Sequence, residues 1–300
     1  MPTLLETTTK DYPVHYSTAK IDNLDVFYRD AGPKDAPVFL LLHGFPTSSN
    51  MFRNLIPRLA GAFRVIAPDL PGFGLTTMLD HTKYSYTFEN LMNVVDGLVE
   101  HLGLKQYSMY VMDYGAPVGY RLALRHPERV QALIIQNGNA YDEGLREFWD
   151  PIKKYWNEAT PTNREGIRFL VEPKSTKWQY ENGVKDTSLL DPTTWTLDQL
   201  GLDRPGNAEI QLDLFYDYRT NVPLYPAFQE FFRKFQPPTL IVWGKNDFIF
   251  PPEGAHPYSR DLKNIETHML DTGHFALETH GDEIASRIHG FLKRNGIARD

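Results

Sequence analysis

Short runs of apolar residues recur along the chain, and each run is followed by turn residues and then by a helical pattern. Continuous apolar runs of this kind are typical of strands that are buried on both faces of a sheet. The runs comprise residues 38–42, 64–67, 108–112, 130–135, 239–243 and 266–270. Because these strands alternate with helices, the pattern predicts an α/β fold with a mostly parallel sheet between two layers of helices.

This regularity breaks between about residues 140 and 235. The stretch is rich in Trp, Tyr, Phe and charged residues, and helical spacing is clearest at residues 208–218 and 224–235. Prolines punctuate it at Pro161, Pro173, Pro192, Pro205 and Pro223. We interpret the stretch as a helical cap (residues 140–235) inserted into a core made of residues 1–139 and 236–300.

In such a sheet, ligands bind beyond the carboxyl ends of the strands. Asp113 stands there, between the strand of residues 108–112 and a helix predicted at residues 115–125. This is the layout of a nucleophile elbow, which lifts a side chain above the sheet beside free backbone N–H groups. A serine that attacked a saturated carbon would form an ether, whereas a carboxylate forms an ester that water can cleave. Asp113 therefore predicts displacement at carbon rather than acyl transfer.

Two further polar residues follow late strands of the predicted sheet. Asp247 comes after residues 239–243, and His274 comes after residues 266–270. With Asp113 they stand in the chain order nucleophile, acid, base, which is the order of an α/β-hydrolase triad. We expect the three side chains to meet, because the carboxyl ends of parallel strands lie at one edge of a sheet.

Together these motifs resemble the α/β-hydrolase superfamily, specifically its branch of epoxide hydrolases and haloalkane dehalogenases. The resemblance rests on the Asp113 turn, the late Asp and His, the His-Gly-Phe-Pro stretch at residues 43–46, and residues 69–74. It covers residues 25–292, the cap more loosely than the core. It implies an eight-stranded, mostly parallel sheet flanked by helices, with a cis bond expected between Phe45 and Pro46.

The resemblance also implies a mechanism in two steps. Asp113 attacks a substrate carbon and forms a covalent alkyl ester. His274, oriented by Asp247, then takes a proton from the water that attacks the ester carbonyl. The backbone N–H groups of Phe45 and Tyr114 are expected to hold the resulting oxyanion.

The two activities of this branch differ in their leaving group. A halide leaves as a stable anion held by weak N–H donors, which resembling dehalogenases supply from a Trp after the nucleophile, with an Asn in the oxyanion loop or a second Trp in the cap. The first two of these positions hold Tyr114 and Phe45 here. An epoxide leaves as an alkoxide and needs a proton, which phenols can supply. Epoxide hydrolases supply it from two Tyr of the cap.

The cap offers candidates for both tyrosines. Tyr218 begins a Tyr-Arg-x-Asn stretch placed as that family requires, and it is predicted to be one proton donor. Tyr155 is predicted to be the other, with Tyr141 and Tyr180 as competitors. The sequence thus favours an epoxide hydrolase that acts on a small apolar epoxide.

Other features favour a haloalkane dehalogenase with the same triad, which is the alternative. Residues 46–49 and 53–54 and Val111 are more typical of dehalogenases. The cap also holds Trp149, Trp156, Trp178 and Trp195, any of which could donate to a halide. Asn137 and Asn139 lie where some dehalogenases place the catalytic acid, but neutral amides cannot do that work. A non-catalytic ligand-binding protein of this fold is a third interpretation, which the intact triad disfavours.

Composition narrows the possible partners. The net charge is −7 and no run of Lys or Arg occurs, which disfavours nucleic acid and anionic membranes as partners. The N-terminal residues lack a signal-peptide pattern, and no apolar stretch approaches the roughly 18 residues of a membrane span. The chain has no Cys, and its His residues lack metal-ligand spacing. We expect a cytoplasmic monomer or homodimer without a cofactor or a metal.

Overall fold

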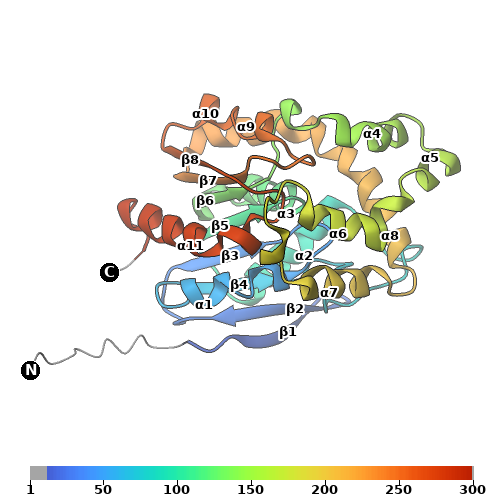
Figure 1. Ribbon diagram of the computed structural model, residues 1–300. Coiled ribbons are helices and arrows are strands. Elements are labelled where there is room, and N and C mark those ends of the chain that lie inside the picture. Colours follow the sequence, from blue (N-terminus) through green and yellow to red (C-terminus); the bar gives the residue numbers. More distant parts are fainter. Residues whose placement is uncertain (1–11, 299–300) are drawn as a thin grey trace, which may run out of the picture.

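The computed structural model describes residues 12–298, and an eight-stranded sheet forms its centre (Figure 1). The strands are β1 (His15–Ile21), β2 (Leu24–Ala31), β3 (Val38–Leu42), β4 (Arg64–Pro68), β5 (Tyr107–Met112), β6 (Val130–Gln136), β7 (Thr239–Gly244) and β8 (Ile265–Leu270). Their order in the sheet is β1-β2-β4-β3-β5-β6-β7-β8. Strands β3 to β8 are parallel, whereas β2 pairs antiparallel with β1 and β4. The expected mostly parallel sheet is confirmed.

All six strands predicted from the apolar runs are present, and no boundary differs by more than one residue. The apolar runs did not predict β1 and β2, which lie at one edge of the sheet. The predicted helix after the elbow is α3 (Gly115–Arg125).

Helices cover both faces of the sheet, as the alternation along β3 requires. Phe39 and Leu41 belong to the apolar cluster shared with α1 (Leu55–Leu59) and α11 (Ala276–Arg294). Leu40 and Leu42 point to the opposite face and share a cluster with α2 (Phe88–His101) and α3. Figure 1 shows α1 and α11 in front of the sheet. All four of these β3 side chains are fully buried, so neither face of the sheet is open to solvent at its centre.

Only helices and loops connect β6 to β7 within the described residues. The α-helices of this stretch are α4 (Asp150–Asn157), α5 (Pro161–Glu165), α6 (Pro173–Glu181), α7 (Pro192–Leu202), α8 (Asn207–Asp217) and α9 (Tyr225–Phe235). Pro161, Pro173 and Pro192 each occupy the first turn of a helix, where a missing N–H is tolerated. In Figure 1, α4 to α8 gather at one end of the sheet. We propose that this stretch is the cap predicted at residues 140–235.

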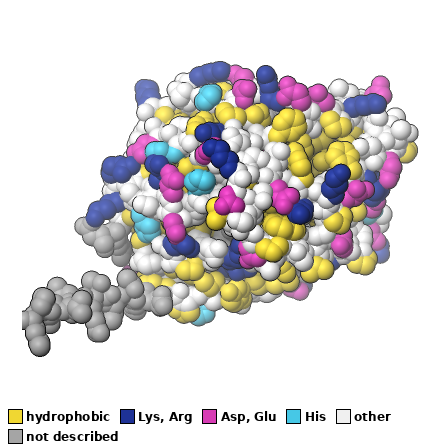
Figure 2. All heavy atoms as spheres, in the orientation of Figure 1, with side chains coloured by type: hydrophobic (Ala, Val, Ile, Leu, Met, Phe, Trp, Pro, Cys, Tyr) yellow, Lys and Arg dark blue, Asp and Glu magenta, His cyan; other side chains and the backbone are white. Residues whose placement is uncertain are grey.

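Positive and negative side chains are mixed on the visible surface of the protein. Figure 2 shows Lys and Arg side chains mixed with Asp and Glu over the visible face, while apolar side chains gather over the cap helices. Exposed apolar residues of that stretch include Phe169, Leu189, Leu197 and Leu200. None of the helices in residues 12–298 combines the length and the apolar character needed to span a bilayer.

Candidate active site

Asp113 occupies a sharp turn between β5 and α3. Its φ of +50° lies in the left-handed region, which residues other than Gly seldom adopt. Two glycines allow this turn to pack against the loop after β3. A Cβ on Gly44 would come within 2.3 Å of Asp113 Oδ1, and a Cβ on Gly115 would lie 2.1 Å from the carbonyl oxygen of Leu42. The strained geometry is that of the predicted nucleophile elbow.

The two carboxylate oxygens of Asp113 have different partners. Oδ1 accepts hydrogen bonds from the backbone N–H of Phe45 at 2.7 Å and of Tyr114 at 2.6 Å. Oδ2 faces Nε2 of His274 at 3.8 Å. The N–H groups are the two expected from the sequence, and the bond from Phe45 to Pro46 is cis, as expected. Oδ2 is thus the oxygen available for attack, while Oδ1 already lies where an oxyanion would form.

His274 and Asp247 are the other two residues of the predicted triad. Nδ1 of His274 lies 2.7 Å from Oδ2 of Asp247. Asp247 also accepts hydrogen bonds from the side-chain amide of Asn137 at 2.8 Å and from the backbone N–H of Ile249 at 2.8 Å. Its carboxylate therefore meets only donors, and it fixes the proton of His274 on Nδ1. The opposite nitrogen, Nε2, has no hydrogen-bond partner within the described chain, so it is free to take a proton from water.

Burial and charge shift the pKa values of this pair. Burial raises the pKa of Asp113 to about 6, against the opposing effects of His274 and of the two backbone N–H groups. Burial alone would lower the pKa of His274, but Asp247 outweighs it and raises that pKa above its ordinary value, with a further contribution from Asp113. Burial and neighbouring charges thus raise the pKa of both groups above their ordinary values, and perturbed pKa values of this kind are frequent at functional sites.

The cavity above Asp113 is small, with a volume of about 10 Å³. Such a space holds about one water molecule. It is lined by Asp113, Phe45, Tyr114, Phe148, Trp149, Gln179, Phe215 and Ile249. A larger groove of about 360 Å³ lies between α7 and the loop after β4, but no triad residue lines it. The small cavity is the candidate site because Asp113, the predicted nucleophile, lines it, and its small volume means that a substrate enters only if cap side chains move.

Tyr218 lies next to this cavity at the start of the short 3-10 helix η7 (Tyr218–Thr220). Its ring packs between Trp149, at a centroid distance of 4.4 Å, and Trp156, at 5.9 Å. The side chain is 0% exposed, and its hydroxyl has no hydrogen-bond partner among residues 12–298. Burial raises the pKa of Tyr218 well above its ordinary value, with Tyr225 and Asp113 adding to the rise. The hydroxyl is therefore a protonated donor, and the hydroxyl of Tyr225 is a neighbouring acceptor for it.

Arg121 links the helix of the nucleophile to the turn of Tyr218. From α3, its guanidinium donates hydrogen bonds to Oδ1 of Asn221 and to Oγ1 of Thr220. The side chain is buried, and such a cation anchors its neighbours because separating it from them would leave a charge unpaired. Arg121 was not predicted to be a site residue, although an Arg among the apolar residues of a buried helix is a signal that the sequence offers.

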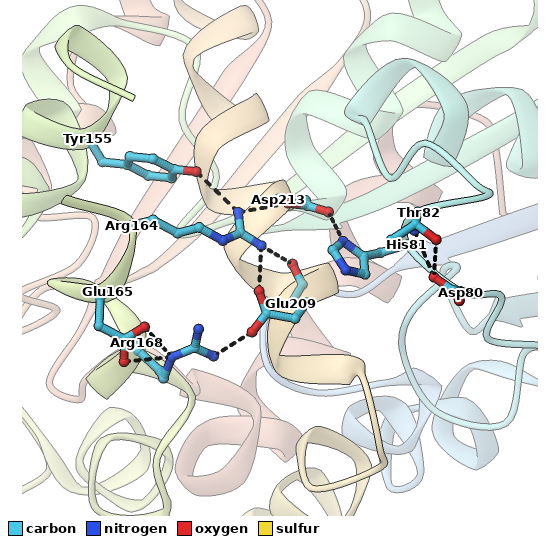
Figure 3. A network of polar contacts seen from close by, with 9 residues as sticks. All are labelled: Asp80, His81, Thr82, Tyr155, Arg164, Glu165, Arg168, Glu209 and Asp213. Atoms are coloured by element: carbon cyan, nitrogen blue, oxygen red, sulfur yellow. Dashed lines mark hydrogen bonds and ion pairs between the residues drawn. The ribbon is translucent and has the colours of Figure 1, made fainter. Parts of the chain in front are cut away.

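Tyr155 does not lie in the cavity. In Figure 3 its hydroxyl points to Arg164, whose Nη1 donates to it at 3.1 Å and which also binds Asp213 and Glu209. The structure does not bring Tyr155, predicted to be the other proton donor, to the cavity of Asp113; it precedes Trp156 on α4, and consecutive helical residues point about 100° apart. The side chain of Trp156 points toward Tyr218, and the side chain of Tyr155 points toward Arg164.

The two competing tyrosines are also engaged elsewhere. Tyr141 donates its hydroxyl to Oδ2 of Asp261 at 2.7 Å. Tyr180 donates to Oδ2 of Asp198. Neither lines the cavity above the nucleophile within the described chain.

The indole N–H groups nearest to Tyr218 are occupied as well. Trp149 donates to the carbonyl oxygen of Ile249 at 2.9 Å, and Trp156 donates to that of Phe215 at 2.7 Å. Trp178 and Trp195 do not line the cavity of Asp113 in the described chain. No cap Trp therefore presents a free N–H to this cavity in residues 12–298.

One cluster brings together ligand atoms that could suit a metal. Single atoms of Asp96, Glu100 and His126 lie within 4.8 Å of one another. Arg125 already pairs with Asp96, and Arg129 pairs with Glu100. These cations supply the positive charge that a metal would bring, so we assign no metal to the cluster.

Known proteins resemble this chain over nearly its whole length. The sequence model of the α/β-hydrolase fold family matches residues 37–281. An uncharacterized hydrolase of Saccharomyces cerevisiae is 48% identical and aligns over 91% of this chain and 95% of its own. A haloalkane dehalogenase of Mycolicibacterium paratuberculosis is 38% identical over 93% of both chains. The structure of the haloalkane dehalogenase DbeA from Bradyrhizobium elkani shares the fold, with a TM-score of 0.78 at 22% identity, covering 95% of this chain and 99% of that chain. This chain therefore belongs to the α/β-hydrolase family, and it is a hydrolase related to the haloalkane dehalogenases.

Proposed function

We propose that this protein is an epoxide hydrolase that converts small apolar epoxides into vicinal diols through an ester on Asp113. The observation that carries the proposal is the buried, protonated hydroxyl of Tyr218, whose ring packs against Tyr114 and Trp149 beside the Asp113 cavity. The neighbouring indole N–H groups, which a halide would need, are bonded to backbone carbonyls. Tyr218 can thus donate a proton to an alkoxide, whereas the neighbouring indoles offer no free N–H group to bind a halide. The cytoplasmic location and the monomeric or homodimeric state stay predictions.

In the first step, Oδ2 of Asp113 attacks an epoxide carbon and the carbon–oxygen bond of the ring breaks. Tyr218 transfers its proton to the departing oxygen, which becomes a hydroxyl while Tyr218 becomes a phenolate. Meanwhile the N–H groups of Phe45 and Tyr114 hold Oδ1 and keep Oδ2 directed toward the cavity.

In the second step, Nε2 of His274 takes a proton from water, and the oxygen of that water attacks the ester carbonyl of Asp113. The negative charge develops on Oδ1, which is already bonded to the N–H groups of Phe45 and Tyr114. When the intermediate collapses, the bond to the departing diol oxygen breaks and that oxygen takes the proton held by His274. The carboxyl group of Asp113 then loses the remaining proton of the attacking water, which restores the carboxylate. The proton released by ester hydrolysis returns to the phenolate of Tyr218.

Haloalkane dehalogenation is the second candidate, because a relative of that name is 38% identical to this chain. It needs the same triad but different donors. Neither Phe45 nor Tyr114 has a side-chain N–H at the positions where resembling dehalogenases bind the halide.

A paired assay separates the two activities. The purified protein is expected to convert styrene oxide into its diol and to release no bromide from 1-bromobutane, because an alkoxide needs the proton of Tyr218 and a halide does not. Diol would be measured by chromatography and bromide by an ion assay. Bromide release without diol would assign the chain to dehalogenation instead.

Tyr218→Phe is expected to slow ester formation from an epoxide by at least tenfold, since general acids contribute about 10²–10⁴-fold. Rapid-quench single-turnover kinetics would measure this step. Tyr155→Phe is the matched control: it removes a phenol of the same cap that bonds to Arg164, so its rate is expected to stay near that of the unaltered protein. Equal rates for Tyr218→Phe and the unaltered protein would contradict the assignment.

The two steps are expected to respond differently to pH. Ester formation needs the Asp113 carboxylate, whose pKa burial raises to about 6, so this rate falls as pH drops through that value. Ester hydrolysis needs neutral His274. Esterification removes the Asp113 charge that helps to raise the pKa of His274, so this pKa is lower in the intermediate than in the resting protein. Single-turnover rates across about pH 5 to 9 would test both limbs, and ester formation that stays constant below pH 6 would contradict the first.

A further inference from the structure

Opening an epoxide is assisted best when two donors meet the departing oxygen, and of the two cap tyrosines predicted as donors the described structure brings Tyr218 to the Asp113 cavity but not Tyr155. Tyr141, Tyr155 and Tyr180 are bonded elsewhere. We propose that Tyr114, the residue after the nucleophile, is the second hydroxyl donor to the epoxide oxygen. This inference rests on the proposed epoxide hydrolase activity and deepens it.

Tyr114 has two functional groups at the site. Its backbone N–H binds Oδ1 of Asp113, and its ring packs against Phe45 and Phe215, which line the cavity of Asp113 together with Tyr114. The side chain is 1% exposed, yet its hydroxyl has no hydrogen-bond partner among the described residues. Buried hydroxyls in native proteins are nearly always paired, so an unpaired one beside a nucleophile calls for a partner that arrives with the substrate.

The surroundings of the ring explain why no protein group satisfies this hydroxyl. Phe88 packs edge-on against it at 4.9 Å, and Phe45, Phe73 and Phe215 lie at 5.9, 6.3 and 6.2 Å. These side chains hold the ring in place without offering an acceptor. A hydroxyl fixed in this way is ready for an acceptor and loses little freedom when one binds.

The ring of Tyr218 is the neighbour that matters for the chemistry. Its centroid lies 6.0 Å from that of Tyr114, with an angle of 44° between the planes. Two neighbouring phenols thus lie beside one cavity: the hydroxyl of Tyr114 has no partner among the described residues, and that of Tyr218 has the hydroxyl of Tyr225 as its polar neighbour. Burial raises the pKa of each well above its ordinary value, so both are protonated at neutral pH.

Tyr218 and Tyr114 have different roles in opening the epoxide. Tyr218 transfers its proton to the epoxide oxygen as the bond to carbon breaks, whereas Tyr114 keeps its proton and donates a hydrogen bond to the same oxygen. Only one proton moves in this step, and it is the one that ester hydrolysis later returns. Tyr218 belongs to the cap and Tyr114 to the core, so the oxygen is held between these two parts of the chain.

Tyr114→Phe tests this role, because it removes the hydroxyl and keeps both the ring and the backbone N–H that binds Asp113. Ester formation from styrene oxide is expected to slow by about 10–100-fold, while hydrolysis of the ester keeps its rate. The double variant with Tyr218→Phe is expected to be slower than either single variant. Rapid-quench kinetics would follow both steps, and thermal unfolding would verify that the variants fold.

Tyr107→Phe is the matched control. Tyr107 also has a buried hydroxyl without a partner in the described chain, but it lies at the start of β5 and does not line the cavity. Its variant is expected to form the ester at the rate of the unaltered protein. If Tyr114→Phe also does so while Tyr218→Phe is slow, the inference is overturned and the proposed function stands. If the unaltered protein forms no diol, both are overturned.

Discussion

His274→Gln is expected to stop the protein at the covalent ester, so that each molecule gains the mass of one epoxide. The first step needs only the Asp113 carboxylate and a proton donor, neither of which His274 supplies. The second step needs a base at Nε2, and Gln provides none. Turnover is expected to fall by about 10⁴-fold or more, and intact-protein mass spectrometry would detect the trapped ester.

Asp113→Ala provides the control for this trap. The variant is expected to show neither turnover nor adduct, and adding it to His274→Gln is expected to abolish the mass gain. In the unaltered protein, turnover in heavy-oxygen water is expected to label Asp113, because water attacks its carbonyl carbon. Normal turnover in either variant would contradict the triad assignment. An unlabelled Asp113 after many turnovers would exclude the ester itself.

The centre of the fold could be predicted because its strands are buried on both faces. Such strands appear as continuous apolar runs, and β3 to β7 fit this description, whereas β8 is an edge strand in which only Leu270 is buried. The first two strands, β1 and β2, follow another pattern. In β2, Leu24 and Val26 are buried whereas Asp25 is exposed, and this alternation is hard to distinguish from a loop in a single sequence.

The core of the site could be predicted for a related reason. Asp113, Asp247 and His274 each follow a parallel strand, so the topology alone brings them to one edge of the sheet. The cap has no such constraint. The difference between Tyr155 and Trp156 is one step of about 100° around α4, which only packing decides. Likewise, Arg121 and Asn221 are far apart in sequence, and no local pattern predicts their contact.

The contacts of Asp247 determine which ring nitrogen of His274 carries the proton. Its Oδ2 accepts from both His274 and Asn137, and its Oδ1 accepts from the backbone N–H of Ile249. An amide at this position would turn its NH₂ group toward one of these donors. If the NH₂ group faces His274, Nδ1 must become an acceptor and the ring proton moves to Nε2. The base is then blocked at the atom that has to accept the proton of water.

Asp247→Asn is therefore expected to slow ester hydrolysis by about 10⁴-fold, as the loss of the correct tautomer does in serine proteases, while ester formation continues and the adduct accumulates. Asp247 also raises the pKa of His274, so the pH limb of the residual hydrolysis is expected to move to lower pH. Asp213→Asn, in the Arg164 network of the cap, is the control and is expected to hydrolyse the ester normally. Hydrolysis within tenfold of the unaltered rate in Asp247→Asn would mean that another group orients His274.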